Sequence, residues 1–280
     1  MTNIFEIRQR ILSGETSARK EVEVALAKAK ANQQFNALTS LTEERALARA
    51  DEIDARIAAG EELGELAGVP FVVKDNFLAF GGPSTASSKI LANFNAPFQA
   101  TAVQKLEDAG AICIGKANLD AFAHGGSTEN SAFGVTKNAH DQERVAGGSS
   151  GGSAVITALD VVPFALGTDT GGSIGQPASF NGVYGVKPTY GAVSRFGVVA
   201  MASSTDTIGV FAKTAKESQL VMKLMAGLDA RDMNTLPDFW QDEEAPKKAK
   251  IGVVKEFMGE GIDPEVKKAT ENYIEKMRAA

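Results

Sequence analysis

The sequence predicts an α/β fold in which helices and strands alternate along the chain. Short apolar runs, such as 70–73 and 111–114, are separated by segments with helical periodicity, and this alternation is typical of βα units. Hydrophobic residues make up 44% of the 280 residues, which is enough to form a sizeable core. Many of the 28 glycines lie between Gly125 and Gly197, where they indicate close backbone packing rather than disorder.

The first 60 residues have a helical pattern. In the clearest stretch the apolar residues share one face of a helix, and Glu44, Asp51 and Glu52 point away from it. The apolar face consists of Leu47, Ala50, Ile53 and Ile57. Gly60 follows at a position that favours the left-handed conformation after a helix. We therefore predict an N-terminal helical segment over residues 1–60.

Residues 61–228 carry the alternation that predicts the sheet. The expected elements are, in order, a strand at 70–73 that ends at Lys74, a helix at 101–109, a strand at 111–114, a helix at 153–159 and a strand at 161–166. A flexible linker is the alternative for the glycine- and serine-rich run 147–152. However, apolar elements enclose this run on both sides, which is not typical of a linker between domains.

The composition changes after residue 228. Residues 229–250 are expected to form a surface connection. They contain Asp232, Asp238, Asp242, Glu243, Glu244 and Pro246. A strand is predicted at 251–254, and then a helix with Asp263 as its N-cap and Pro264 at its first position. The apolar stripe of that helix, which we expect to be buried against the rest of the chain or against another chain, consists of Val266, Ala269, Tyr273 and Met277.

Composition and charge exclude several classes of protein. The net charge of -6 argues against a chain that binds nucleic acid by itself, although it is compatible with RNA held by a partner. The single cysteine, Cys113, lies in an apolar run and is expected to be a small buried residue in a reducing compartment. The N-terminus has no signal pattern, and no apolar stretch reaches the ~18 residues of a spanning helix. We therefore expect a cytoplasmic protein without membrane contact.

Two serines, Ser149 and Ser173, lie in the G-x-S-x-G pattern that surrounds the nucleophile of α/β-hydrolases. In those enzymes the catalytic histidine follows the serine. Here the only histidines, His124 and His140, precede both serines, so the hydrolase order fails. If either serine is a nucleophile, another base must activate it.

Lys74 is the candidate for that base, because it ends the apolar run 70–73. A lysine becomes a base near neutral pH only if its pKa falls by roughly 3 units from about 10.4, which corresponds to about 4 kcal/mol. Full burial can supply this shift. On position alone, a solvated lysine at the end of a strand is the ordinary interpretation.

Two other kinds of site are not supported. Residues 110–116 fit the G-x-x-x-x-G-K pattern, but Ala117 stands where a phosphate-binding loop needs Ser or Thr, and the interior of the segment is apolar. No cluster of His, Cys and carboxylate residues has the spacing of metal ligands. We therefore expect neither a nucleotide site nor a catalytic metal in this chain.

Three separated motifs resemble the amidase signature family. Residues 147–153 (GGSSGGS) and 167–174 (GTDTGGSI) are similar to the signature itself, and residues 68–76 are similar to the family's lysine segment. The motifs occur in the family's order and with its spacing. The resemblance therefore favours a catalytic Lys74 over a solvated one. It implies an amidase-signature fold, a mixed central sheet with helices on both faces, incomplete at the C-terminus.

The resemblance also implies a domain organisation and a set of roles. One domain over residues 1–280 would contain the helical segment 1–60, a catalytic core over 61–228 and the start of a C-terminal part over 229–280. In the family's Ser-cisSer-Lys mechanism, the acyl-enzyme nucleophile, the proton-relaying serine and the base would be Ser173, Ser149 and Lys74. The backbone N–H groups that would bind the oxyanion lie around Thr170, Gly171 and Gly172.

Within the family, the sequence is most similar to the glutamine-hydrolysing subunits of tRNA-dependent amidotransferases. The similar segments are 115–122, 127–134, 187–191, 193–197, 250–253 and 255–256. This similarity implies that the chain hydrolyses glutamine and passes ammonia to its partners, subunits B and C. The partner would bind the misacylated tRNA and use ATP and Mg²⁺ to convert Glu-tRNA(Gln) to Gln-tRNA(Gln), or Asp-tRNA(Asn) to Asn-tRNA(Asn). The chain itself would hold no cofactor.

Two departures from the family pattern support alternative functions. Gly175 stands where the family usually has Arg, and residues 124–126 (HGG) replace a more usual Met-Gly-Ser near the expected substrate pocket. The alternatives are a stand-alone amidase that hydrolyses small amides and an inactive, truncated assembly module. Because the resemblance implies a missing C-terminal part, we also expect an open pocket and little glutaminase activity in the 280-residue chain alone.

Overall fold

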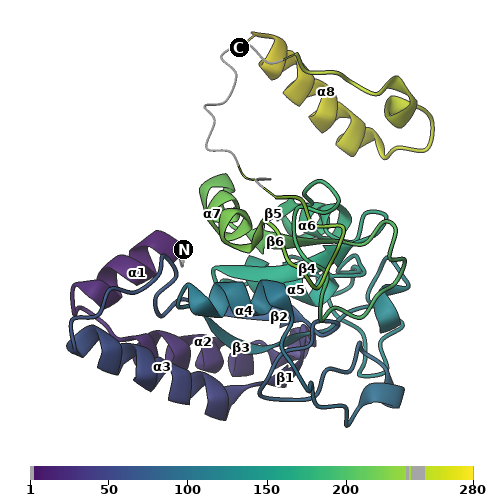
Figure 1. The fold of residues 1–280 in the computed structure, drawn as a ribbon. Helices are drawn as coiled ribbons and strands as arrows, with labels where there is room; N and C mark the ends of the chain where they lie inside the picture. The colour runs from purple at the N-terminus through teal and green to yellow at the C-terminus, as the bar shows by residue number, and fades with distance from the viewer. Residues whose placement is uncertain (1–2, 238–239, 241–249, 280) are drawn as a thin grey trace. The chain divides into compact units, whose positions relative to one another are not determined.

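The computed structural model describes residues 3–237, 240 and 250–279 (Figure 1). Their contacts divide the chain into two units, Met1–Trp240 and Gln241–Ala280. The first unit contains the sheet and seven of the described α-helices, and the second contains one described α-helix. The two units are described separately.

A mixed sheet of six strands forms the centre of the first unit, in the order β1-β3-β2-β4-β6-β5. The strands are β1 (Leu38–Leu41), β2 (Pro70–Lys74), β3 (Ile112–Ala117), β4 (Phe164–Asp169), β5 (Tyr184–Val186) and β6 (Thr207–Ala212). Strand β2 lies parallel to both β3 and β4, and the other pairs are antiparallel. The predicted mixed α/β sheet is therefore confirmed.

Helices lie on both sides of this sheet (Figure 1). They are α1 (Ile4–Leu12), α2 (Ala18–Ala31), α3 (Glu43–Ala58), α4 (Thr101–Asp108), α5 (Gly151–Ala158), α6 (Gly175–Asn181) and α7 (Ala215–Met225). Helix α3 ends as predicted. Gly60 has a φ of +75°, its N–H donates to Ile57 O, and the N–H of Glu61 donates to Arg56 O.

The three central strands are buried along their whole length. Parallel strands covered on both faces are expected to be continuous apolar runs, and β2 and β4 fit this pattern until their last residues. Phe71 of β2 stacks on Phe164 of β4, with ring centroids 5.2 Å apart. The polar residues that end these strands, Lys74 and Asp169, therefore lie at the same edge of the sheet.

Two predictions for the first unit need correction. Strand β1 lies inside the segment 1–60 that was predicted to be helical. It is short and half-buried, and its pairing with β3, a long-range contact, stabilises it where local pattern does not. The predicted strand at 161–166 begins later, because β4 starts at Phe164 and continues through the polar residues Thr168 and Asp169.

At the start of the predicted surface connection, most residues of 230–237 are exposed, but the carboxylates of Asp229 and Asp232 are buried. Asp229 accepts a hydrogen bond from Ser194 Oγ at 2.7 Å, and Asp232 pairs with Arg195 at 2.7 Å. The hydrogen bonds from Arg195 hold the pKa of Asp232 well below its usual range. These carboxylates therefore fasten the segment to the first unit. The remaining acidic residues and the proline of the predicted connection, 238 and 242–246, lie outside the described residues.

The second unit contains the final helix, α8 (Pro264–Ala279). Asp263 caps it as predicted, because its Oδ1 accepts the N–H of Glu265 at 2.8 Å. The strand predicted at 251–254 is wrong, since these residues have no regular structure and lead into a 3-10 helix at Lys255–Met258. The apolar stripe is not buried within the second unit, since Val266 and Tyr273 are 58% and 63% exposed, and its burial against the first unit or against another chain stays a prediction.

Phe164→Ala tests the importance of the central stack. Loss of a fully buried aromatic ring is expected to lower the free energy of unfolding of the first unit by about 3–5 kcal/mol. Urea denaturation followed by circular dichroism measures this change. As a control, Phe257→Ala removes a ring that is 78% exposed and should change stability by less than about 0.5 kcal/mol. Equal effects of the two substitutions would contradict the role of the stack.

Candidate active site

Lys74 ends β2 with its side chain fully buried. Its Nζ lies 2.7 Å from Ser149 Oγ and 2.8 Å from Thr168 Oγ1, and the carbonyl oxygen of Thr168 is 3.4 Å away. Thr168 comes from β4, the parallel neighbour of β2. The sheet thus gives the amine three oxygen partners and no contact with solvent, which confirms the predicted burial.

Burial lowers the pKa of the Lys74 ammonium from 10.5 to about 7. The carboxylates of Asp120, Asp169 and Asp206 act in the opposite direction, because nearby negative charge favours the charged amine. Desolvation is the larger effect. Near neutral pH a substantial fraction of Lys74 is therefore the neutral amine, whose lone pair can accept a proton from Ser149.

Ser149 lies in a tight loop that leads into α5. The peptide bond between Gly148 and Ser149 is cis. The carbonyl of Ser149 accepts the N–H of Asp120 at 3.3 Å, while its hydroxyl faces Lys74. Ser149 is fully buried, so the alternative of a flexible linker for this run is wrong.

Thr128 fixes both ends of the Ser149 loop. Its hydroxyl donates to Gly147 O at 2.8 Å and accepts the N–H of Gly151 at 3.2 Å. The N–H of Thr128 in turn donates to Asp120 Oδ2 at 3.0 Å. Thr128 and Asp120 are both buried. The contacts of Thr128 and Asp120 with the loop leave no space for a side chain at Gly148, because an added Cβ would lie 2.0 Å from Asp120 Oδ2.

Ser173 lies immediately before α6 and is 9% exposed. Its carbonyl accepts the N–H of Ser150 at 3.2 Å, which places the loop of Ser173 against the loop of Ser149. The structure therefore brings Lys74, Ser149 and Ser173 together from three separate segments. Of the three, only Ser173 retains a path to solvent, as a nucleophile requires.

Asp169 shapes the loop that carries Ser173. Its Oδ1 accepts the N–H of Gly172 at 2.7 Å, and its Oδ2 accepts the N–H groups of Ile174 at 2.7 Å and Gly175 at 3.3 Å. A carboxylate that binds several backbone amides forms charge-assisted hydrogen bonds, which are stronger than neutral ones. Asp169 therefore holds the turn around Ser173 in one conformation.

The three residues expected to bind an oxyanion are not equivalent. The N–H of Gly172 already donates to Asp169, and the Thr170 side chain donates to Asp206 Oδ1 at 2.7 Å. Among the described residues, no hydrogen bond uses the N–H of Thr170 or Gly171. Gly172 has a φ of +118°, a conformation that favours glycine.

Sequence reasoning did not assign Thr168, Asp169 and Thr128, which hold the three candidate side chains in place. Asp169 gives a usable local signal, since an aspartate just before a turn often accepts backbone N–H groups. Thr168 could have been identified as the polar end of a strand next to Lys74. Thr128 gives no local signal, because its partners lie 19 and 23 residues further along the chain.

The histidines do not take part in this arrangement. His124 Nδ1 lies 2.8 Å from Phe122 O, and His140 Nε2 lies 2.9 Å from Asn181 O.

Cys113 is buried as predicted, and burial raises the pKa of its thiol to about 11. Among residues 3–237, 240 and 250–279, no group of three or more His, Cys, Asp or Glu side chains could hold a metal ion. None of the helices in this described part is long and apolar enough to cross a membrane.

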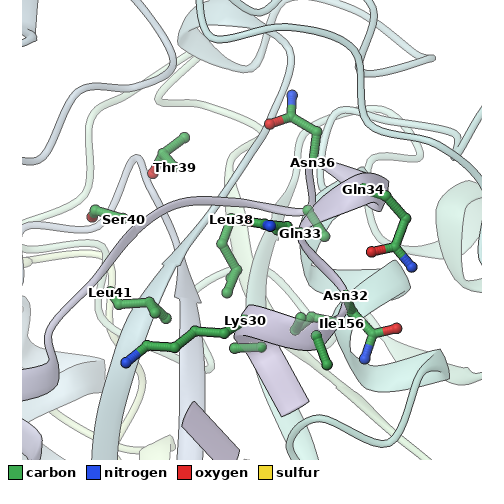
Figure 2. Close-up of a pocket in the computed structure, with 13 residues that line it drawn as sticks. Lys30, Asn32, Gln33, Gln34, Asn36, Leu38, Thr39, Ser40, Leu41 and Ile156 are labelled. Carbon is green, nitrogen blue, oxygen red and sulfur yellow. The ribbon is translucent and has the colours of Figure 1, made fainter. Parts of the chain in front are cut away.

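Two hollows lie near the sheet. One of about 630 Å³ follows the edge strand β1 and the end of α2, and Figure 2 shows the polar and apolar side chains that line it. None of the three candidate catalytic residues lines it. The other, of about 230 Å³, is lined by residues that include Thr168, Arg195 and Asp206. It adjoins the candidate site, because Thr168 contacts Lys74.

Comparison with known proteins gives concordant results. The family model described as Amidase matches residues 21–280. The A subunit of the glutamyl-tRNA(Gln) amidotransferase from Gloeobacter violaceus is 50% identical over 284 residues, covering 99% of this chain and 58% of that protein. The chain thus spans about three fifths of the length of the curated relatives that it matches.

Solved structures with the same fold include two kinds of amidase. The A subunit of the glutamyl-tRNA(Gln) amidotransferase from Thermotoga maritima has a crystal structure with a TM-score of 0.69 and 42% identity, covering 79% of this chain and 46% of that one. The peptide amidase from Stenotrophomonas maltophilia has a TM-score of 0.80 and 34% identity, covering 85% of this chain and 50% of that one.

Proposed function

The chain belongs to the amidase family, and we propose that it hydrolyses a carboxamide through an acyl-enzyme on Ser173. The observation that carries this proposal is the fully buried contact of 2.7 Å between Lys74 Nζ and Ser149 Oγ, next to the more accessible Ser173. A neutral lysine in a dry site can act as a base, and an adjacent base is what a serine hydroxyl needs to become a nucleophile.

The proposed reaction begins as Ser173 Oγ attacks the carbonyl carbon of the amide. The Ser173 proton passes to Ser149 Oγ while the Ser149 proton passes to Lys74 Nζ, so the ammonium forms where three oxygen atoms surround it. The C–O bond forms and the carbonyl electrons move to its oxygen. The backbone N–H groups of Thr170 and Gly171 would bind that oxyanion, and no described hydrogen bond occupies them.

The tetrahedral intermediate then breaks its C–N bond. The leaving nitrogen takes the proton from Lys74 through Ser149, and a primary amide leaves as ammonia. Water then attacks the carbonyl carbon of the acyl-enzyme and gives its proton to Ser149, while the Ser149 proton passes to Lys74. When the ester C–O bond breaks, Ser173 Oγ takes the proton back through Ser149 and the free acid leaves. The lowered pKa of Lys74, about 7, lets its amine accept the Ser149 proton in the first step and lets the resulting ammonium donate a proton in the second step.

We propose glutamine as the amide, with the chain acting as the glutamine-hydrolysing subunit of a tRNA-dependent amidotransferase. The 50% identity to the A subunit of such an enzyme supports this choice. Subunits B and C would be its partners in a cytoplasmic heterotrimer, and ammonia would pass to the partner that holds Glu-tRNA(Gln) or Asp-tRNA(Asn). ATP and Mg²⁺ would be used by that partner, and no step on this chain needs them.

A stand-alone amidase is the second candidate, and the similarity to a peptide amidase supports it. At Gly175, where the family usually has Arg, an added Cβ would meet no atom within 4 Å. The fold therefore accepts either residue. The absence of an Arg side chain beside Ser173 would permit a different acyl group.

Covalent capture tests the nucleophile. A fluorophosphonate should form an adduct on Ser173, because this serine is slightly exposed whereas Ser149 is fully buried. Peptide mass spectrometry locates the adduct. Ser173→Ala should remove labelling, and Ser203→Ala, at an exposed serine, should not. A stable adduct on Ser149 with Ser173 unmodified would reverse the two roles.

The pH dependence of labelling tests the base. The rate should rise as pH increases through about 7, because the neutral form of Lys74 gains population in that range. Lys74→Arg should abolish labelling, since a guanidinium stays charged. Lys105→Arg is the control, because Lys105 donates to the carbonyls of Met225 and Ala226 and to none of the candidate catalytic residues. A rate that is independent of pH, or normal labelling of Lys74→Arg, would rule out a lysine base.

Ammonia release separates the two candidate functions. The amidotransferase proposal predicts that glutamine hydrolysis by this chain is weak alone and rises at least about tenfold when subunits B and C of a relative are added, because partners close and order such sites. The stand-alone proposal predicts turnover of simple primary amides without partners and no change on their addition. Ser173→Ala in each mixture is the control for contaminating activity.

A further inference from the structure

Gln176, in the first turn of α6, joins three segments around the candidate site. Its Oε1 accepts the N–H of Gly148 at 2.8 Å, and its Nε2 donates to Gly126 O at 2.9 Å. Its backbone N–H donates to Gly172 O at 2.9 Å. One residue is therefore bonded to the neighbour of Ser173 and to the neighbour of Ser149.

The amide side chain fits this position closely. An added Cβ on Gly147 would lie 2.9 Å from Gln176 Oε1, and one on Gly126 would lie 3.6 Å from its Nε2. Both polar atoms of the side chain are used, one as an acceptor and one as a donor. A carboxylate or an alkyl side chain of the same length would lose at least one of these bonds.

We propose that Gln176 is a positioning residue that sets Ser149 relative to Ser173. The inference rests on the proposed roles of these two serines, and Gln176 itself touches neither reacting oxygen. Gln176 holds the middle of the Ser149 loop through the N–H of Gly148, while Thr128 holds the two ends of the loop. Proton transfer between the two hydroxyls needs hydrogen-bond distance, so the rate depends on this alignment.

The bond to Gly126 extends the same control to residues 124–126. These residues differ from the usual family pattern, and they include the segment expected near the substrate pocket. One side chain therefore holds both residues 124–126 and the Ser149 loop, so a displacement of the first segment would act on the second through Gln176.

Gln176→Met and Gln176→Asn test the proposal. Methionine keeps the length but loses both bonds, and asparagine keeps the amide but is one methylene too short to reach. Both variants should lower the maximal rate of fluorophosphonate capture at Ser173 by about tenfold to 100-fold, the cost of a small misplacement of reacting groups. The apparent affinity for the probe should stay unchanged and the melting temperature should fall by only a few degrees, because Gln176 is half-buried and not part of the core.

Amide hydrogen exchange supplies a readout that needs no reactivity. Both variants should speed exchange at Gly148, whereas Gln104→Met, at an exposed glutamine on α4, should alter neither exchange nor capture. If the unmodified chain is not captured at Ser173, the proposed function fails while exchange still tests the contact. A normal capture rate in either Gln176 variant, or unchanged exchange at Gly148, would overturn the inference.

Discussion

The candidate site depends on one constraint, the burial of a lysine amine at the end of a central strand. Water cannot reach Lys74, so its positive charge is unfavourable and its pKa falls to about 7 despite three carboxylates nearby. The sheet makes this possible, because β2 lies between two parallel neighbours and is buried to its last residue. The central stack of Phe71 and Phe164 excludes solvent from the same strands that carry the polar ends.

The polar groups around Lys74 divide into those that face it and those that hold its neighbours. Ser149 and Thr168 face the amine, whereas Asp169 and Thr128 hold the two serine loops through backbone amides. Burying a polar group costs free energy unless the group is hydrogen-bonded. The conformation of each serine loop is therefore determined by its hydrogen-bond partners rather than by local propensity. Glycine is needed where the loops approach most closely, as at Gly148.

The strands around Lys74 and the two candidate serines could be predicted from the sequence, because short apolar runs and glycine-rich turns have local signatures. The burial of Lys74 followed only from the family resemblance, since a lysine at the end of a strand is ordinarily solvated. It did not reveal β1, whose four residues become a strand only through pairing with β3. It also placed Asp229 and Asp232 on the surface, since nothing local shows that Ser194 and Arg195 bind them. The roles of Thr128 and Gln176 were equally hidden, because their partners lie far away along the chain.

The proposed mechanism requires that Lys74 be largely neutral near pH 7 in the folded chain. Titration of isotope-labelled lysine side chains by NMR, with Lys74→Arg to assign the resonance, measures that state directly. A lysine-base mechanism predicts a titration midpoint at about pH 7 for the Lys74 amine, well separated from the titration midpoints of the exposed lysines. A midpoint near the ordinary value of about 10.4 would show that the amine is charged at neutral pH, and the proposed base would then be wrong.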